Sequence, residues 1–341
     1  MPIILPDGLP ARWSLKAEGL EAASLREAVA QRETDGPGRQ TRRPLRVLLI
    51  NLMPDKPAAE RQLARLLAAT AHPVELALAI PDSYRPKTAD PAHIWAFYQP
   101  WSRMKDQAFD GLIVTGAPVE TLAFEAVTYW RELTEIFDWA RDRVGHSLFI
   151  CWAAQAALRH FHGVPKHRLD AKLSGVYRHR VHAPGHPLMR GFGGDFVTPV
   201  SRHTEVRSGD LPQARGLEIL ASSEEAGLCA VADRPNRALY MFNHLEYETD
   251  TLLREYLRDL RSGEAVAPPR HYFPGDDPSR APVDGWSRYG RLLFGNWLDE
   301  IRRESAARTG PASEPAAAEA GLWAQLAGRW QLARFGQHMS A

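Results

Sequence analysis

Cysteine is scarce in this chain of 341 residues, in which Cys151 and Cys229 are the only two. A small scaffold held together by several disulfide bonds is therefore excluded, and the sequence predicts a protein of the reducing cytoplasm. Long hydrophobic runs are missing as well, because no stretch reaches the roughly 20 apolar residues of a membrane-spanning helix. The first residues lack the basic segment and apolar core of a signal peptide, so we expect no membrane association.

An excess of charge of one sign is also absent. Lysine and arginine total 42 and aspartate and glutamate 41, which gives a net charge of +1. A nucleic-acid-binding protein usually carries a strongly basic surface, so we expect no nucleic-acid partner, and any anion-binding site must be local. Hydrophobic residues make up 44% and charged residues 24%, as in ordinary globular proteins.

The first half of the chain alternates strand and helix patterns. Apolar runs predict strands at 45–52, 74–80, 109–115 and 146–150, and amphipathic spacing predicts helices from Pro57, at 92–98 and at 127–143. Residues 1–44 are interpreted as a polar lead-in with a short helix at 20–30. This alternation is typical of an α/β protein with a doubly wound, mostly parallel sheet.

The second half is richer in short β-like pieces. These are expected at 175–181, 196–206, 217–221, 228–231 and 237–243, followed by a helix at 249–259. Beyond residue 304 the composition shifts to alanine, proline, glutamate and serine. We therefore predict one catalytic domain at 1–304 and a tail at 305–341, with a linker at 305–320 and an amphipathic helix or a poorly ordered end at 322–335.

Cys151 is the leading candidate for a nucleophile. It lies between the predicted strand ending at Ile150 and a helix that begins at Trp152, at the edge where open α/β sheets build their sites. A helix N-terminus stabilises a thiolate. The alternative is a buried structural cysteine, as we expect for Cys229.

His244 and Glu246 are the candidates for a base and the group that orients it. They end another predicted strand, at 240–246, in the chain order expected for such partners of a nucleophile. The two residues are separated by one position, so a regular strand would direct both side chains to one face. The alternative for His244 is a histidine with a purely structural hydrogen bond.

Seven short motifs resemble the homoserine O-acyltransferase family of methionine biosynthesis, which is built on a class I glutamine amidotransferase-like, flavodoxin-like fold. They are NLMPDK at 51–56, TGAPVE at 115–120, VTYW at 127–130, ICWAAQA at 150–156, KLSGVY at 172–177, SRHTEV at 201–206 and HLEY at 244–247. The resemblance covers about residues 1–304. The family often has proline where this chain has Leu245.

The resemblance implies acetyl or succinyl transfer from an acyl-CoA to the hydroxyl of L-homoserine, with no bound cofactor, no metal and a homodimeric assembly. Cys151 would carry the acyl group as a thioester, His244 would act as base and Glu246 would orient it. The backbone N–H groups of Trp152 and Ala117 would form the oxyanion hole.

The resemblance also implies a substrate site and a residue that selects the donor. Lys172, Ser201 and Arg258 match the positions that bind homoserine, and Lys56 matches a family lysine near the site, although a solvated charge is the plain alternative. Glu120 matches the position where glutamate accompanies acetyl-CoA and glycine accompanies succinyl-CoA. A succinyl carboxylate would meet the like charge of Glu120, so we expect acetyl-CoA as co-substrate.

Other functions stay open at this point. A succinyl donor or a serine acceptor would use the same site. A glutaminase would fit the same Cys–His–Glu order, but those enzymes usually have glycines where Phe149 and Ala153 stand. A non-catalytic binding protein with a structural Cys151 would form no acyl-enzyme. His179, His182 and His186 lack accompanying cysteines or paired carboxylates, so we predict no metal site.

Overall fold

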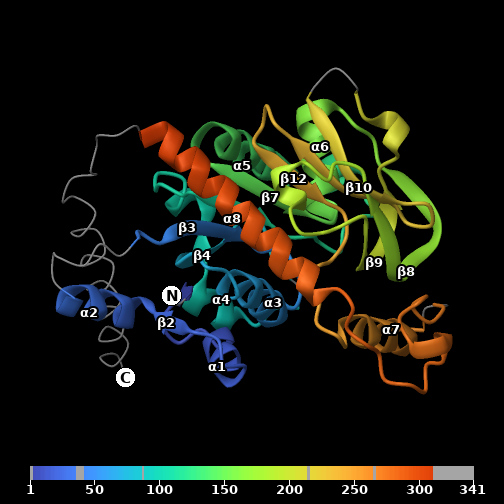
Figure 1. Ribbon diagram of the computed structural model, residues 1–341, viewed down its shortest axis with the longest axis horizontal. Coiled ribbons are helices and arrows are strands. Elements are labelled where there is room, and N and C mark those ends of the chain that lie inside the picture. The colour runs from blue at the N-terminus through green and yellow to red at the C-terminus, as the bar shows by residue number, and fades with distance from the viewer. Residues whose placement is uncertain (1–2, 36–41, 87, 213–215, 264–265, 310–341) are drawn as a thin grey trace, which may run out of the picture. The chain divides into compact units, whose positions relative to one another are not determined.

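The computed structural model describes residues 3–35, 42–86, 88–212, 216–263 and 266–309. The chain divides into two units, Met1–Arg302 and Arg303–Ala341. All the candidate site residues lie in the first unit. The fold of that unit is built on one sheet, which in the described residues has 12 strands (Figure 1).

The centre of the sheet is parallel and confirms the predicted α/β class. The strands follow the order β2-β1-β4-β3-β6-β7-β12-β11-β10-β8-β9. Its parallel part comprises β1 (Ile3–Leu5), β2 (Ala22–Ser24), β3 (Leu45–Ile50), β4 (Val74–Ile80), β6 (Gly111–Val114), β7 (His146–Ile150) and β12 (Ala238–Met241), with β5 (Gln99–Pro100) paired to β4.

An antiparallel extension follows β12 and contains most of the second half of the chain. It consists of β8 (His167–Val181), β9 (Asp195–Glu205), β10 (Leu217–Ser223) and β11 (Gly227–Asp233). Strand β9 returns to the carboxyl end of β7, because the Ser201 carbonyl lies 4.0 Å from the sulfur of Cys151 and the Pro199 carbonyl accepts the N–H of His244 at 2.9 Å.

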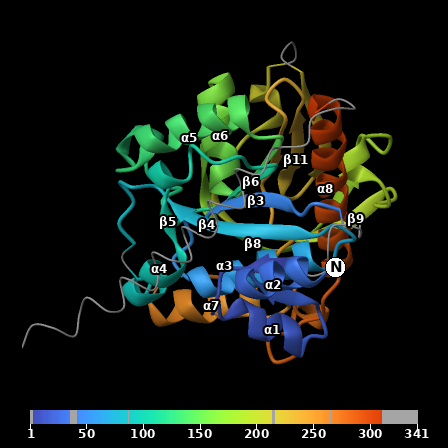
Figure 2. The same cartoon turned by 90° about the vertical axis from the view of Figure 1, so that its left-hand side faces the viewer.

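Helices cover both faces of the parallel strands, because consecutive strand residues point to opposite faces. Leu45, Val47 and Leu49 of β3 pack on one side and Leu48 and Ile50 on the other. The helices of the unit are α1 (Ala11–Ala17), α2 (Leu25–Asp35), α3 (Lys56–Ala68), α4 (Pro91–Phe97), α5 (Trp130–Arg143), α6 (Trp152–His162), α7 (Thr251–Arg261) and the greater part of α8 (Ser287–Thr309). Figure 2 shows α5 and α6 on one side of β3 and β4 and α1, α2 and α3 on the other.

Three predictions about the elements were wrong in part. The N-terminal lead-in instead forms β1 and β2 and two helices, and α2 begins at Leu25 because residues 22–24 pair with β1. The helix α8 was not predicted, although Phe294, Trp297 and Ile301 give it a buried stripe at helical spacing. It continues to Thr309, so residues 305–309 are helical rather than linker. The helix predicted at 322–335 lies outside the described residues.

Candidate active site

The predicted nucleophile occupies a sharp turn between strand and helix. β7 ends at Ile150 and α6 begins at Trp152, and Cys151 between them adopts φ 53° and ψ −116°. A non-glycine residue with positive φ is strained, and such strain is typical of functional turns. The turn after β6 packs directly against it, because a Cβ placed on Gly116 would lie 3.2 Å from the Cβ of Cys151 and 3.7 Å from its sulfur. A side chain at position 116 would therefore press on Cys151.

The structure brings His244 and Glu246 together beside Cys151. Nδ1 of His244 lies 2.7 Å from Oε1 of Glu246, and the ring stacks on Tyr247 at 4.2 Å between centroids. The expectation that a regular strand aligns the two residues was wrong, because β12 ends at Met241 and residues 244–247 form a turn closed by the Tyr247 N–H to the His244 carbonyl at 3.3 Å. His244 and Glu246 are nevertheless in contact, because the turn also brings their side chains together.

The charges of the site favour the protonated imidazole. Burial alone would lower the pKa of His244, but the negative charges of Glu246, which contacts the ring, and of Cys151 outweigh it and raise this pKa well above its usual value of 6.5. A base of raised pKa beside a thiol favours proton transfer from sulfur to nitrogen. The arrangement is therefore suited to nucleophilic catalysis by sulfur.

Helix α8 supports the turn that carries the base. Gly290 faces the carbonyl of Leu245, and a Cβ at position 290 would lie 2.6 Å from that oxygen. A side chain there would push the helix and the turn apart. Leu245 itself, the middle residue of the turn, is buried in the core and fixes the turn from the other side of its backbone.

The two residues predicted to form an oxyanion hole are near Cys151 in the chain or in the fold. Trp152 is the first residue of α6, so its N–H is among those that have no partner one turn earlier in the helix. Ala117 is buried in the turn after β6, next to Gly116, which contacts Cys151. Both predicted positions thus border the nucleophile.

A polar cluster extends from the nucleophile to α7. The Ser201 carbonyl lies 4.0 Å from the sulfur of Cys151, and the Ser201 hydroxyl donates to Glu255 Oε2 at 2.6 Å. Nζ of Lys172 lies 2.7 Å from Asp259 Oδ2 and 3.6 Å from the same Glu255 oxygen. Two carboxylates of one helix thus hold the lysine and the serine of the predicted substrate site.

Arg258 completes this cluster, because its Nη2 lies 2.7 Å from Asp259 Oδ1. The structure therefore joins Lys172, Ser201 and Arg258, three residues from β8, β9 and α7. Glu255 and Tyr247 were missed by sequence reasoning. The Tyr247 hydroxyl donates to Glu255 Oε1 at 2.7 Å. Glu255 lies three residues before Arg258 on a helix, which is the spacing of side chains that share a face. The sequence could therefore have indicated that Glu255 lies near Arg258.

Glu120 lies in the turn region after β6, with its carboxylate directed at β9. Its Oε2 accepts the backbone N–H of His203 at 3.0 Å, two residues after Ser201. Lys166 donates to the carbonyls of Glu120 and Leu122, the latter at 2.6 Å. The residue predicted to select the donor is thus held at both its backbone and its side chain, on the same strand as the substrate cluster.

Lys56 is buried, with 0% of its surface exposed, so the alternative of a solvated charge was wrong. Its ammonium donates to the Asn51 carbonyl at 2.7 Å and lies over the rings of Tyr84 and Tyr98. Burial lowers its pKa to about 8, although Glu60 opposes the shift. These contacts place Lys56 in a separate buried cluster at the end of β3.

The comparisons with known proteins identify the family of the chain. A family model described as homoserine O-succinyltransferase matches residues 2–306. The chain belongs to this family. The resemblance of the seven motifs is thereby confirmed.

Relatives of high identity carry a second name within the family. A homoserine O-acetyltransferase of Novosphingobium aromaticivorans is 51% identical over 300 residues, 88% of this chain and 95% of the relative. One of Brucella canis is 49% identical over 301 residues, with the same two shares. The family model and these relatives thus agree on the acceptor in their names and differ on the acyl group.

Solved structures confirm the predicted fold type. A Thermoplasma acidophilum protein described as a GMP synthase component has 14% identity and a TM-score of 0.50, covering 79% of this chain and 100% of its own. A glutamine amidotransferase of Thermotoga maritima has 13% identity and a TM-score of 0.50, covering 77% and 99%. At such identity the likeness shows the class I glutamine amidotransferase-like fold alone.

Two further observations on the described residues concern metal binding and membrane-spanning helices. No group of three or more histidine, cysteine or acidic side chains arranged to hold a metal ion occurs there. The described helices include none with the length and apolar character needed to cross a membrane.

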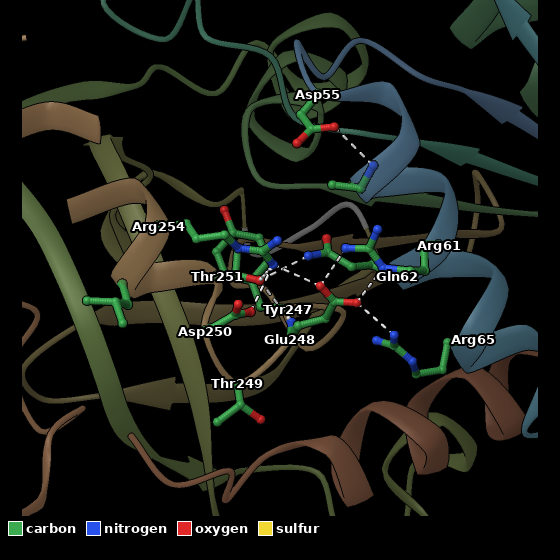
Figure 3. A network of polar contacts seen from close by, with 12 residues as sticks. Asp55, Arg61, Gln62, Arg65, Tyr247, Glu248, Thr249, Asp250, Thr251 and Arg254 are labelled. Carbon is green, nitrogen blue, oxygen red and sulfur yellow. Dashed lines mark hydrogen bonds and ion pairs between the residues drawn. The ribbon is translucent and has the colours of Figure 1, made fainter. Parts of the chain in front are cut away.

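A network of ion pairs holds the chain segment that follows the turn with His244 (Figure 3). Glu248 follows Glu246 by two residues and accepts hydrogen bonds from Arg61 and Arg65 of α3, both at 2.7 Å, and from Arg254 of α7 at 2.8 Å. Burial alone would raise the pKa of the Glu248 carboxyl, but the three arginines outweigh it and lower this pKa to about 2. The network ties α3 and α7 to the segment after β12.

We expect Glu248→Gln to lower Tm by about 5 °C at pH 7, which corresponds to about 2 kcal/mol of lost ionic stabilisation. A depressed carboxyl pKa stabilises the folded state fully above the ordinary value of 4.5, and this contribution is lost as pH falls towards about 2. The Tm difference between variant and wild type should therefore narrow below pH 4.5, as measured by thermal unfolding.

The matched control is Asp250→Asn, which removes a neighbouring carboxylate that pairs with Arg254 one helical turn away and is 57% exposed. Its Tm should change by only about 1 °C. A Tm difference for Glu248→Gln that stays constant from pH 7 to pH 3.5 would contradict the assigned role of the charge.

Proposed function

We propose that this chain transfers an acetyl group from acetyl-CoA to the hydroxyl of L-homoserine, giving O-acetyl-L-homoserine and CoA through a thioester on Cys151. Family membership makes the chain an acyltransferase of homoserine. The observation that carries the covalent route is the placement of Cys151 at a strained strand-to-helix turn, beside a buried histidine whose Nδ1 lies 2.7 Å from Glu246.

The first half-reaction forms the acyl-enzyme. His244 takes the proton of the Cys151 thiol, and the thiolate attacks the thioester carbonyl of acetyl-CoA. The tetrahedral intermediate collapses, the bond to the CoA sulfur breaks, and CoA leaves with the proton from His244. Glu246 holds the ring and stabilises its protonated form throughout. The N–H groups of Trp152 and Ala117 are proposed to bind the oxyanion.

The second half-reaction delivers the acetyl group to homoserine. The neutral His244 takes the proton of the substrate hydroxyl, whose oxygen attacks the thioester carbonyl of the acyl-enzyme. The carbon–sulfur bond then breaks and Cys151 recovers its proton from His244. A sulfur leaving group makes this step easier than transfer from an ester would be.

The cluster of β8, β9 and α7 has the charges required by an amino-acid substrate. Arg258 is proposed to pair with the carboxylate of homoserine, because its side chain is 61% exposed and comes from the helix that also carries Glu255. Glu255, which contacts Ser201 and Lys172, is proposed to face the ammonium group. This arrangement would orient the hydroxyl towards the thioester.

Acetyl-CoA is the donor that Glu120 favours. The two relatives named above are acetyltransferases by name, while the family model carries the succinyl name. The carboxylate of Glu120 is held on β9, where the terminal carboxylate of a succinyl group would approach it. Like charges at this range repel, and an acetyl group lacks the second charge.

Detection of the acyl-enzyme tests the proposal. Mixing the protein with acetyl-CoA in the absence of homoserine should add the mass of one acetyl group to the peptide that contains Cys151, and homoserine should remove it with formation of its O-acetyl ester. Succinyl-CoA and serine serve as competing donor and acceptor. Homoserine-dependent CoA release without any adduct on that peptide would instead indicate direct transfer.

Arg258→Ala is expected to raise the KM for homoserine by about 10- to 100-fold, because it removes a charge-assisted hydrogen bond worth about 1.5–3 kcal/mol. Acyl-enzyme formation from acetyl-CoA should be unchanged, since Arg258 serves the acceptor. Steady-state kinetics and the mass adduct measure the two effects separately. Arg261→Ala, on the last turn of α7, is the control and should leave both values near wild type.

A further inference from the structure

A buried cation follows the strand residue whose carbonyl contacts Cys151, and it has no function in the mechanism above. Arg202 follows Ser201 on β9 and is 2% exposed. Its Nη1 donates to Asn243 Oδ1 at 2.7 Å and its Nη2 to the Ala226 carbonyl, and neither partner is an anion. Its buried Nε has no hydrogen-bond partner among the described residues. A charge buried in this way is costly to keep.

Arg202 is next in the chain to a residue that contacts Cys151. The carbonyl of the preceding residue, Ser201, lies 4.0 Å from the sulfur. Burial lowers the pKa of the Arg202 guanidinium, and the thiolate of Cys151 leads the charges that oppose this shift. An anionic sulfur and a guanidinium buried one residue from its contact would stabilise each other in a medium that screens charge weakly.

A second link runs from Arg202 to the base. Asn243 is fully buried and immediately precedes His244. Its Nδ2 lies 2.9 Å from Nε2 of His179, whose Nδ1 lies 2.9 Å from the Tyr177 carbonyl. Burial lowers the pKa of His179 to about 4, so its ring is neutral, with Nδ1 donating and Nε2 accepting. Because Nε2 accepts, the Asn243 amide presents its nitrogen to His179 and its oxygen to Arg202.

We propose that Arg202 is a positioning residue of the acyl-transfer site: its buried charge stabilises the anionic sulfur of Cys151, and its hydrogen bond to Asn243 holds the segment that carries His244. The inference deepens the proposed function and concerns the same site. It assigns two separable effects, one of charge and one of geometry.

The pH dependence of Cys151 alkylation by iodoacetamide separates these effects without requiring turnover. The ionisable groups around the sulfur and the guanidinium include His244, Glu246 and Tyr247 from the turn after β12, Glu255 behind Ser201, Glu205 of β9, Glu120 after β6, Tyr177 and His179 of β8, and Cys229 of β11. The Arg202 variants leave all of these unchanged. Cys229 is fully buried with a pKa raised to about 12, and a Cys151→Ser blank accounts for any reaction there.

Arg202→Gln keeps a donor and removes the charge, and we expect it to raise the alkylation midpoint by about one to two pH units. Arg202→Lys keeps the charge but loses the two hydrogen bonds to Asn243 and Ala226. Its alkylation midpoint should therefore stay within about 0.3 pH unit of wild type, while kcat falls at least about tenfold. Asn243→Ala should behave like Arg202→Lys.

Equal midpoints for Arg202→Gln and wild type would overturn the role of the charge. If neither Arg202 variant is recovered folded, Asn243→Ala decides, because wild-type kcat in that variant would overturn the positioning of His244. Arg46→Gln is the matched control: it removes the ion pair with Glu75 at the far end of β3 and should cost stability without moving the midpoint. Failure of wild type to form an acyl-enzyme would refute the proposed function, whereas the alkylation comparison would still decide the inference.

Discussion

Cys151→Ala is expected to lower kcat for acetyl transfer by at least about 10⁴-fold and to abolish the acyl-enzyme. Alanine has no atom that can form the thioester, and direct attack by homoserine would lack the leaving group that the mechanism provides. The fold should persist, because Cys151 packs in a turn whose geometry is set by β7 and α6. CoA release with acetyl-CoA and homoserine measures the loss.

The second cysteine supplies the control for this prediction. Cys229 lies on β11 and is fully buried, so Cys229→Ala creates a small cavity that costs about 1 kcal/mol of stability and leaves kcat within about threefold of wild type. Residual activity of Cys151→Ala within about tenfold of wild type would show that the thioester is not on the reaction path.

Glu120→Gly is expected to raise kcat/KM for succinyl-CoA relative to acetyl-CoA by about 10²- to 10³-fold. Two like charges about 4 Å apart repel by about 4 kcal/mol at an effective dielectric of about 20, which corresponds to roughly three decades in rate. The His203 N–H holds the carboxylate in place at 3.0 Å, so it cannot simply turn away from an approaching succinyl group. Coupled assays with each donor give the ratio.

Glu120→Gln separates charge from bulk in this prediction, because the amide keeps the size and an oxygen acceptor for His203. If charge carries the selection, Glu120→Gln should recover most of the succinyl activity of Glu120→Gly. Glu125→Gly, at a carboxylate that is 61% exposed on the same connection, should leave the donor ratio unchanged. An unchanged ratio in Glu120→Gly would mean that another residue selects the donor.

The central strands were predictable because they are buried on both faces. β3 and β4 lie in near-continuous apolar runs and β7 ends in one, as is typical of strands inside a parallel sheet. β1 and β2 have three residues each, too few to show a period, and they exist because pairing with each other and with β4 stabilises them. The turn at 244–247 was mistaken for strand because its composition continues the pattern of β12.

The candidate site was predictable to the extent that it depends on local order along the chain. The position of Cys151 between strand and helix follows from neighbouring residues, and the separation of His244 from Glu246 keeps them in reach in either a strand or a turn. The supporting contacts were not predictable in this way. Ser201 meets Glu255, which is 54 residues away, only because β9 and α7 pack beside each other.

The sequence by itself determined the α/β class, the candidate nucleophile at the end of β7 and the family, because each rests on short segments whose pattern is independent of the rest of the chain. Only the tertiary structure decided that Lys56 is buried, that Glu120 is tied to β9, and that Arg202 is buried next to the residue whose carbonyl contacts the sulfur. Burial and charge pairing depend on which distant segments share one core, and no local pattern specifies that packing.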